Sequence, residues 1–120
     1  MEAQHFKIPI KAFSQNMFYK KYNNRIVISE EGRQYKKNIA DYLIKNYENI
    51  ICHDEPILLY IEFGFIDKRI HDLDNLNQPL INSLKNILYT DDKHIFELHT
   101  RKFLDQHDNY INIEIKKLKD

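Results

Sequence analysis

Two pairs of aspartates stand out because carboxylates at such short spacing can share a metal ion. Asp72 and Asp74 are separated by one residue, and Asp91 and Asp92 are adjacent. Side chains at i and i+2 of an extended backbone point the same way, and two unit charges roughly 4 Å apart repel by about 4 kcal/mol at an effective dielectric of 20. A hard divalent cation such as Mg²⁺ offsets that repulsion and prefers oxygen ligands. It can activate a water and stabilise the leaving oxygen of a phosphodiester.

Each pair also has an ordinary structural explanation. Asp-x-Asp-Asn before a helix is commonly an N-cap, and Asp-Asp in a polar loop is commonly solvated. The stretch between the pairs predicts one helix of about 12 residues, which spans about 18 Å. A tertiary bend would have to bring the pairs together, and the spacing leaves that open.

Histidines flank the same segments and leave a weaker alternative open. His71, His94 and His99 could join an aspartate in a transition-metal site, as in a metallohydrolase acting on small phosphoesters. No tight His-x-x-x-His spacing is present.

Length and composition limit the class of protein. The chain has 120 residues, with 18 Lys and Arg against 18 Asp and Glu, and this length fits a single domain. No apolar run approaches the ~18 residues of a spanning helix, and Met-Glu-Ala-Gln-His is no basic start of a secretory signal. The single cysteine, Cys52, excludes an internal disulfide or thiolate zinc site. We therefore expect a cytoplasmic protein with no membrane segment.

The zero net charge hides an asymmetry along the chain. Residues 1–47 carry nine basic and four acidic side chains, whereas residues 48–120 carry nine basic and fourteen acidic ones. One small domain can therefore present a cationic face beside a cluster of carboxylates. The zero total does not exclude a nucleic-acid partner.

The elements that must position these residues follow from periodicity. Strands are predicted at 6–10, with Pro9 favouring a sheet edge, at 25–28, and at 57–66, which is apolar on both faces like a central strand. Two more strands, at 95–104 and 110–118, are joined by a polar turn at 105–109. Residues 13–24 show little periodicity.

Two helices are predicted. Ser29 is a candidate N-cap for a helix over 30–47, in which Gly32 is either a point of close approach or simply tolerated. A second apolar stripe predicts a helix over 76–88, and Pro79 is tolerable in the first turn, which places the start near Asp74 or Asn75. Asn86 is a candidate left-handed residue at its end.

The order of elements predicts an α+β fold. We expect one domain over residues 1–120, with a small mixed or antiparallel sheet of about four strands packed by two main helices.

These motifs resemble the RusA-like family of Holliday-junction (crossover-junction) endodeoxyribonucleases. The matching stretch begins Lys68-Arg69-x-x-Asp72-Leu-Asp74-Asn75-Leu and, after one helix, ends Ile87-x-Tyr89-x-Asp91-Asp92-x-x-Ile95. Upstream, Asn16, Tyr19 and Ser29-x-x-Gly32-Arg33-x-Tyr35 also fit, so the resemblance covers about residues 6–117.

The resemblance implies a homodimer that binds four-way DNA junctions and nicks two opposing strands with Mg²⁺, with Mn²⁺ as the alternative ion. Asp72, Asp74 and Asp92 would be the catalytic metal ligands, with Asp91 a helping neighbour. Phosphate contacts would position the DNA without reading its sequence, and the candidates for them are Lys20, Lys21, Arg25, Arg33, Lys36, Lys37, Lys68, Arg69 and Lys85.

Two departures from the family pattern keep an alternative open. The family usually has a lysine four residues after the second aspartate of Asp-x-Asp and an acid four residues further on, where this chain has Gln78 and Asn82. A lysine that stabilises transition-state charge can contribute roughly 10²–10³ in rate. The alternative is a catalytically impaired relative that binds DNA, or grips another protein as an inhibitor or immunity-type partner, without cleaving.

Overall fold

The elements follow one another in an order close to the predicted one. The structure, a computed structural model, describes residues 3–118. Its elements are β1 (Gln4–Ile8), α1 (Gln15–Phe18), β2 (Tyr19–Tyr22), β3 (Arg25–Ile28), α2 (Glu30–Asn46), β4 (Ile57–Gly64), α3 (Leu73–Leu84), the 3-10 turn η1 (Asp92–His94), β5 (Ile95–Phe103) and β6 (Tyr110–Lys117).

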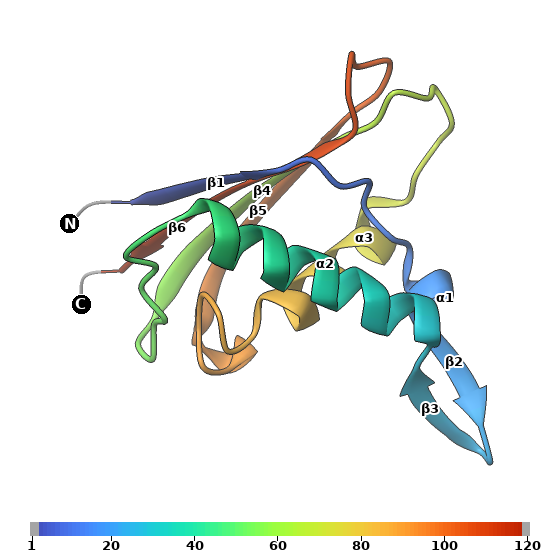
Figure 1. Cartoon of the computed structure of the whole chain (residues 1–120), viewed down its shortest axis with the longest axis horizontal. Helices are drawn as coiled ribbons and strands as arrows, with labels where there is room; N and C mark the ends of the chain where they lie inside the picture. Colours follow the sequence, from blue (N-terminus) through green and yellow to red (C-terminus); the bar gives the residue numbers. More distant parts are fainter. Residues whose placement is uncertain (1–2, 119–120) are drawn as a thin grey trace.

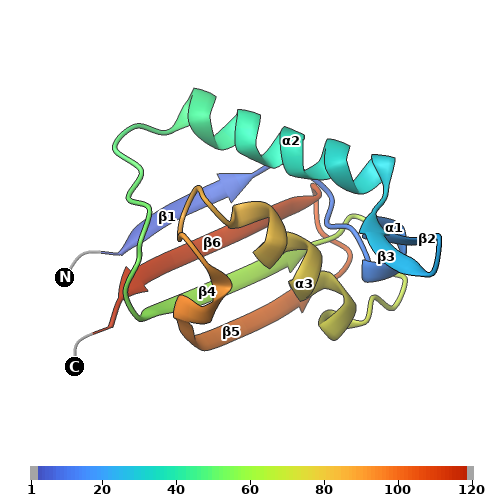
Figure 2. The same cartoon turned by 90° about the horizontal axis from the view of Figure 1, so that it is seen from below.

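Four of the strands form a mixed sheet in the order β1-β6-β4-β5. Strand β6 is antiparallel to β1 and to β4, and β5 is parallel to β4. Helices α2 and α3 lie side by side on one face of the sheet (Figure 2), and the other face carries no helix within residues 3–118. The predicted α+β class with two main helices is confirmed.

The core lies between this sheet and its two helices. Strand β4 is central, as predicted, and its odd-numbered residues from Ile57 to Phe63 are fully buried under the helices. Strand β6 alternates as predicted, with Ile111, Ile113 and Ile115 buried between half-buried polar residues. Strand β1 lies at one edge of the sheet, and β5 lies at the other.

Helix α2 begins at the predicted cap. The Ser29 hydroxyl oxygen accepts a hydrogen bond from the Gly32 N–H (2.9 Å) and donates one to the Met17 carbonyl oxygen (2.7 Å). A Cβ on Gly32 would lie 2.5 Å from the Phe18 carbonyl oxygen and 2.8 Å from Ile28 Cγ2. Gly32 is therefore a point of close approach, where the start of α2 packs against the end of α1.

Residues 13–24 are more ordered than their weak periodicity indicated. Helix α1 has Ser14 as its N-cap, and β2 pairs antiparallel with β3. The two strands are joined at Asn23 and Asn24, whose φ angles are 49° and 61°; asparagine tolerates this left-handed region better than most residues. This hairpin projects from the body of the domain beside α1 (Figure 1).

The prediction for Pro79 was wrong. Helix α3 begins at Leu73 and ends at Leu84, so Pro79 lies in its interior rather than in its first turn. The ring removes one backbone donor, but Pro79 is buried, and this packing offsets part of the loss. Asn86 has the predicted left-handed conformation, with φ at 69°, two residues past the end of the helix.

Candidate functional site

Asp72 and Asp74 lie where α3 begins, beyond the carboxyl end of β4. Asp72 is the N-cap residue, with extended backbone, and its side chain makes no capping hydrogen bond. Its nearest polar partner is the Asn75 side-chain amide, 3.5 Å from Oδ2. Asp74 is in the first turn, and both side chains are exposed. An N-cap carboxylate ordinarily accepts a hydrogen bond from a backbone N–H of the first turn. The Asp72 carboxylate makes no such bond, so its oxygen atoms are available to a ligand.

Asp91 and Asp92 lie just before β5. Asp91 Oδ1 accepts a hydrogen bond from the Lys93 N–H at 3.0 Å. This bond, and a second one with the Asp92 side chain, hold the pKa of the Asp91 carboxyl below its usual value, with a smaller contribution from the Lys85 charge. The two carboxyl groups are therefore close to one another, and Lys85 lies on their side of the molecule.

The two pairs lie at opposite ends of the domain within one chain. Helix α3 has 12 residues and is about 18 Å long. Asp91 and Asp92 adjoin Ile95, which pairs with Ile57 at the start of β4, whereas the segment leading to Asp72 follows the end of β4 at Gly64. The tertiary bend that would unite the pairs is absent.

The aspartate side chains are of the kind that binds Mg²⁺, but one chain does not bring them together. Carboxylate oxygens are the ligands that Mg²⁺ prefers. Residues 3–118 nevertheless contain no group of three or more His, Cys, Asp or Glu side chains arranged to hold an ion. The set of Asp72, Asp74 and Asp92 that the resemblance implies is therefore not assembled within one chain, and neither is a histidine-aspartate site.

The basic candidates fall into separate groups. Lys20, Lys21 and Arg25 surround the tip of the projecting hairpin, where all three are exposed and no acidic residue is present. The hairpin also exposes two large apolar side chains, Tyr22 and Ile26.

The remaining basic candidates are distributed between α2 and the two acidic ends. On α2, Arg33 donates to the Ile28 carbonyl oxygen and Lys37 pairs with Asp41 at 2.6 Å, while Lys36 is half-buried. Lys68 and Arg69 lie in the segment before Asp72. Lys85 lies near Asp91 instead.

Asp67, which the sequence pattern did not single out, contacts residues of the segment that precedes Asp72. Asp67 contacts His71 Nε2 at 2.9 Å, Lys11 Nζ at 3.2 Å and the Arg69 N–H at 3.1 Å. These contacts, the one with His71 first, lower the pKa of Asp67 to about 2. The His71 ring stacks on Phe65 with 3.8 Å between centroids. His71 is thus a structural residue here, and the spacing of four residues between Asp67 and His71 was the sequence signal for it.

A hollow beside this cluster extends from it to α1. It has a volume of about 280 Å³ and is lined by Lys11, Met17, Arg69, His71 and other residues of the two segments. The acidic end of α3 therefore borders a basic concavity rather than open acidic surface.

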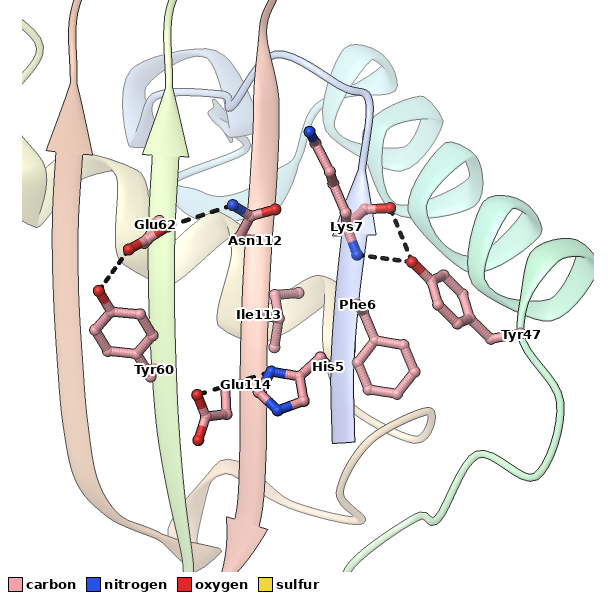
Figure 3. Close-up of a pocket in the computed structure, with 9 residues that line it drawn as sticks. All are labelled: His5, Phe6, Lys7, Tyr47, Tyr60, Glu62, Asn112, Ile113 and Glu114. Carbon is pink, nitrogen blue, oxygen red and sulfur yellow. Dashed lines mark hydrogen bonds and ion pairs between the residues drawn. The ribbon is translucent and has the colours of Figure 1, made fainter. Parts of the chain in front are cut away.

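A larger hollow, of about 370 Å³, lies elsewhere, over strands β1, β6 and β4 (Figure 3). Its polar groups satisfy one another: Glu62 accepts hydrogen bonds from the Tyr60 hydroxyl (2.6 Å) and the Asn112 amide (3.3 Å), and His5 faces Glu114 at 3.8 Å. Such cross-strand pairs stabilise a sheet. The hollow contains none of the four aspartates.

Comparison with known proteins shows that the sequence is similar to endodeoxyribonucleases. A family model described as Endodeoxyribonuclease RusA matches residues 8–116. The Crossover junction endodeoxyribonuclease RusA of Escherichia coli (strain K12) is 32% identical over 90 residues, which cover 74% of each chain. The Crossover junction endodeoxyribonuclease rusA of Enterobacteria phage 82 is 31% identical over 103 residues, covering 85% of this chain and 84% of the relative.

The chain belongs to the RusA family, and the predicted resemblance is confirmed. No helix in the described part of the chain is long and apolar enough to cross a membrane.

Proposed function

We propose that this protein is a structure-selective DNA endonuclease that resolves four-way junctions by paired nicks, acting as a homodimer with Mg²⁺ or Mn²⁺. The observation that carries the proposal is the exposed Asp72 carboxylate at the start of α3, which makes no capping hydrogen bond in a chain of the RusA family. An N-cap carboxylate that makes no capping hydrogen bond fits a role toward a ligand.

The chain's own groups have distinct parts in this proposal. Asp72 and Asp74 supply carboxylates at the start of α3, and Asp92, with Asp91 beside it, supplies them at the start of β5. A divalent ion would contribute water activation and stabilisation of the leaving oxygen. No coordination geometry is assigned, because one chain does not bring these carboxylates together.

The basic residues would hold the DNA backbone. The hairpin with Lys20, Lys21 and Arg25 projects without a nearby acid and suits phosphate contacts. Arg33, Lys36 and Lys37 on α2, Lys68 and Arg69 before Asp72, and Lys85 near Asp91 would add phosphate contacts from separate parts of the surface. Their contacts would set affinity and its salt dependence rather than sequence preference.

The test is cleavage of a synthetic four-way junction in Mg²⁺ and in Mn²⁺. We expect the wild-type protein to cut it, Asp72→Asn and Asp74→Asn to abolish cutting, and Glu48→Gln, an exposed acid just after α2, to leave it unchanged. A wild-type protein that cuts no branched DNA in either metal would contradict the proposal.

The second candidate is the impaired relative that binds without cutting. Gln78 and Asn82 favour it, because both replace charged residues usual in the family, and so does the zero net charge. A salt series on junction binding tests it. DNA binding that weakens steeply with salt in a protein that never cuts would support a binder, and no DNA affinity at all would support a protein antagonist.

A further inference from the structure

A hollow between α1 and the β2-β3 hairpin combines three kinds of side chain. It has a volume of about 350 Å³, and pockets that bind small molecules begin at about 300 Å³. The residues that line it, none of them acidic, are Gln15, Asn16, Tyr19, Lys20, Lys21 and Ile26. The hollow therefore offers an aromatic ring and an aliphatic side chain, two amides and two ammonium groups in one place.

One face of the hairpin is directed into this hollow. Tyr19 and Lys21 are two residues apart on β2, so their side chains share a face. Ile26 lies directly opposite Lys21 in the antiparallel register, and opposed residues also share a face. Ile26 is 76% exposed, so no part of residues 3–118 covers most of this side chain. The Tyr19 ring and Ile26 are therefore the apolar surfaces that a ligand would meet.

The Tyr19 ring is held in place by the core. Tyr19 is half-buried, and its ring meets the Phe18 ring edge to face, with 4.8 Å between the centroids and 81° between the planes. Phe18 is fully buried, and its carbonyl oxygen accepts a hydrogen bond from the Ser29 N–H at 2.8 Å. The ring is thus fixed before a ligand arrives, and binding against it loses little conformational freedom.

The polar groups around the ring have no partner within residues 3–118. This holds for the side-chain amides of Gln15 and Asn16, the Tyr19 hydroxyl, and the ammonium groups of Lys20 and Lys21. In the larger hollow over β1, β6 and β4, by contrast, Glu62 is hydrogen-bonded to its neighbours (Figure 3). The polar groups beside the hairpin are therefore available to a ligand.

We propose that this hollow binds one unpaired nucleotide of a DNA strand, with its base against Tyr19 and Ile26. Aromatic side chains stack on unpaired bases. The amides of Gln15 and Asn16 offer the donor and acceptor that a base edge requires, and the ammonium groups of Lys20 and Lys21 contact the adjoining phosphates. The inference rests on the proposed function only in taking DNA as the ligand, and it requires neither a metal ion nor strand cleavage.

Such a site favours branched DNA over linear duplex. Removing a base from a duplex costs pairing and stacking energy, and this cost is smallest where the base is already unpaired. The site also lies near the candidate catalytic residues. Helix α1 separates it from the hollow lined by Met17, Arg69 and His71, and the four residues of α1 rise only about 6 Å. A strand held beside the hairpin therefore passes close to the Asp72 end of α3.

The test compares two DNA duplexes that differ only at a single bulged position, which carries either thymidine or an abasic residue. Their affinities are measured by fluorescence anisotropy in EDTA, so that no strand is cut. Wild-type protein should bind the thymidine bulge more tightly than the abasic bulge by roughly 5- to 150-fold, the range that one stacked base provides. A fully paired duplex should bind no better than the abasic one.

Single substitutions separate contacts with the base from contacts with the phosphates. Tyr19→Leu, Gln15→Ala and Asn16→Ala should each reduce the preference for the thymidine bulge, with Tyr19→Leu giving the largest loss. Lys20→Gln should weaken binding to both bulges by the same factor. Gln34→Ala, which removes an exposed amide on α2, is the matched control and should keep the full preference. Gln15 and Asn16 are exposed, so their variants carry the test if Tyr19→Leu fails to fold.

The outcomes distinguish this site from the proposed nuclease activity. A wild type that binds neither bulge, or binds the two equally, overturns the inference, and so does a preference that survives all three substitutions at Tyr19, Gln15 and Asn16. A protein that prefers the thymidine bulge but never cuts a junction keeps the nucleotide site and loses the proposed function. A protein that cuts junctions without this preference keeps the function and loses the site.

Discussion

The buried Tyr89 hydroxyl should be a measurable source of stability, because it closes the end of α3. It donates a hydrogen bond of 2.6 Å to the Ile81 carbonyl oxygen, and Tyr89 is fully buried. Ile81 is among the last four residues of α3, whose carbonyl oxygens have no partner within the helix. Burial, and secondarily the charge of Asp92, raise the pKa of Tyr89, so the hydroxyl keeps its proton at any ordinary pH.

Replacing Tyr89 with Phe keeps the ring and removes only the donor. A buried carbonyl left without a partner costs about 1–3 kcal/mol, so we expect Tyr89→Phe to lower the free energy of unfolding by that amount. The midpoint of thermal unfolding should fall by roughly 4 °C for each kcal/mol in a domain of this size. Urea unfolding followed by circular dichroism measures the first quantity, and differential scanning calorimetry measures the second.

Tyr35 provides the matched control. Its hydroxyl is also buried, but it makes only a loose contact with the Phe13 backbone, outside hydrogen-bond geometry. Tyr35→Phe should therefore change stability by less than about 0.5 kcal/mol or increase it, since a buried polar group without a partner is unfavourable. Equal losses in the two variants would refute the reasoning, because they would show that removing the oxygen atom, and not its hydrogen bond, sets the cost.

Three further predictions concern Asp67, the hairpin and Gly32. The pKa of Asp67 is lowered to about 2, so the ionised Asp67 carboxylate stabilises the fold fully above the unfolded carboxyl pKa of about 3.9 and loses this effect as the pH falls toward 2. In urea unfolding, Asp67→Asn should be less stable than wild type near pH 5 and should approach wild type near pH 2. A difference that stays constant with pH would contradict this. Each single substitution in the hairpin, Lys20→Gln, Lys21→Gln or Arg25→Gln, should weaken junction binding and reduce the slope of log affinity against log salt by up to about 0.9. Lys45→Gln, at the far end of α2, should change neither the affinity nor the slope. An unchanged slope in all four variants would exclude the hairpin from the DNA interface. Gly32→Ala places a Cβ 2.5 Å from the Phe18 carbonyl oxygen and should destabilise the fold by about 1–3 kcal/mol in urea unfolding, and a neutral result would show that α1 can move away from α2.

The sequence predicted the parts of the fold that depend on local chemistry. Ser29 caps α2 because its hydroxyl reaches the Gly32 N–H within a single turn. The isoleucines of β6 alternate because one sheet face is buried and the other carries no helix. Asn86 adopts φ at 69° after α3 because asparagine tolerates that region.

Features that depend on tertiary contacts were not visible in the sequence. Pro79 is accommodated inside α3 by burial, which no local rule registers. Strand β2 reads Tyr-Lys-Lys-Tyr and has no alternation of apolar and polar residues, so the sequence did not predict it. Asp67 contacts not only His71 but also Lys11, which is 56 residues away in the sequence.

In the candidate site, too, local features could be predicted from the sequence and tertiary placement could not. Spacing and family resemblance pointed to all four aspartates, and the start of α3 was located to within two residues. The position of Asp92 relative to Asp72 depends on the parallel pairing of β4 with β5, which sends β5 back along the full length of α3.

The central claim, that this protein resolves four-way junctions, is tested most directly by mapping the products of one reaction. A fixed junction labelled in turn on each of its four strands is incubated with wild-type protein in Mg²⁺, beside a linear duplex of the same sequence and beside Asp72→Asn. The account predicts nicks at symmetric positions in two opposing strands of the junction, none in the duplex, and none with Asp72→Asn. Equal cutting of junction and duplex, or cutting that survives Asp72→Asn, would contradict it.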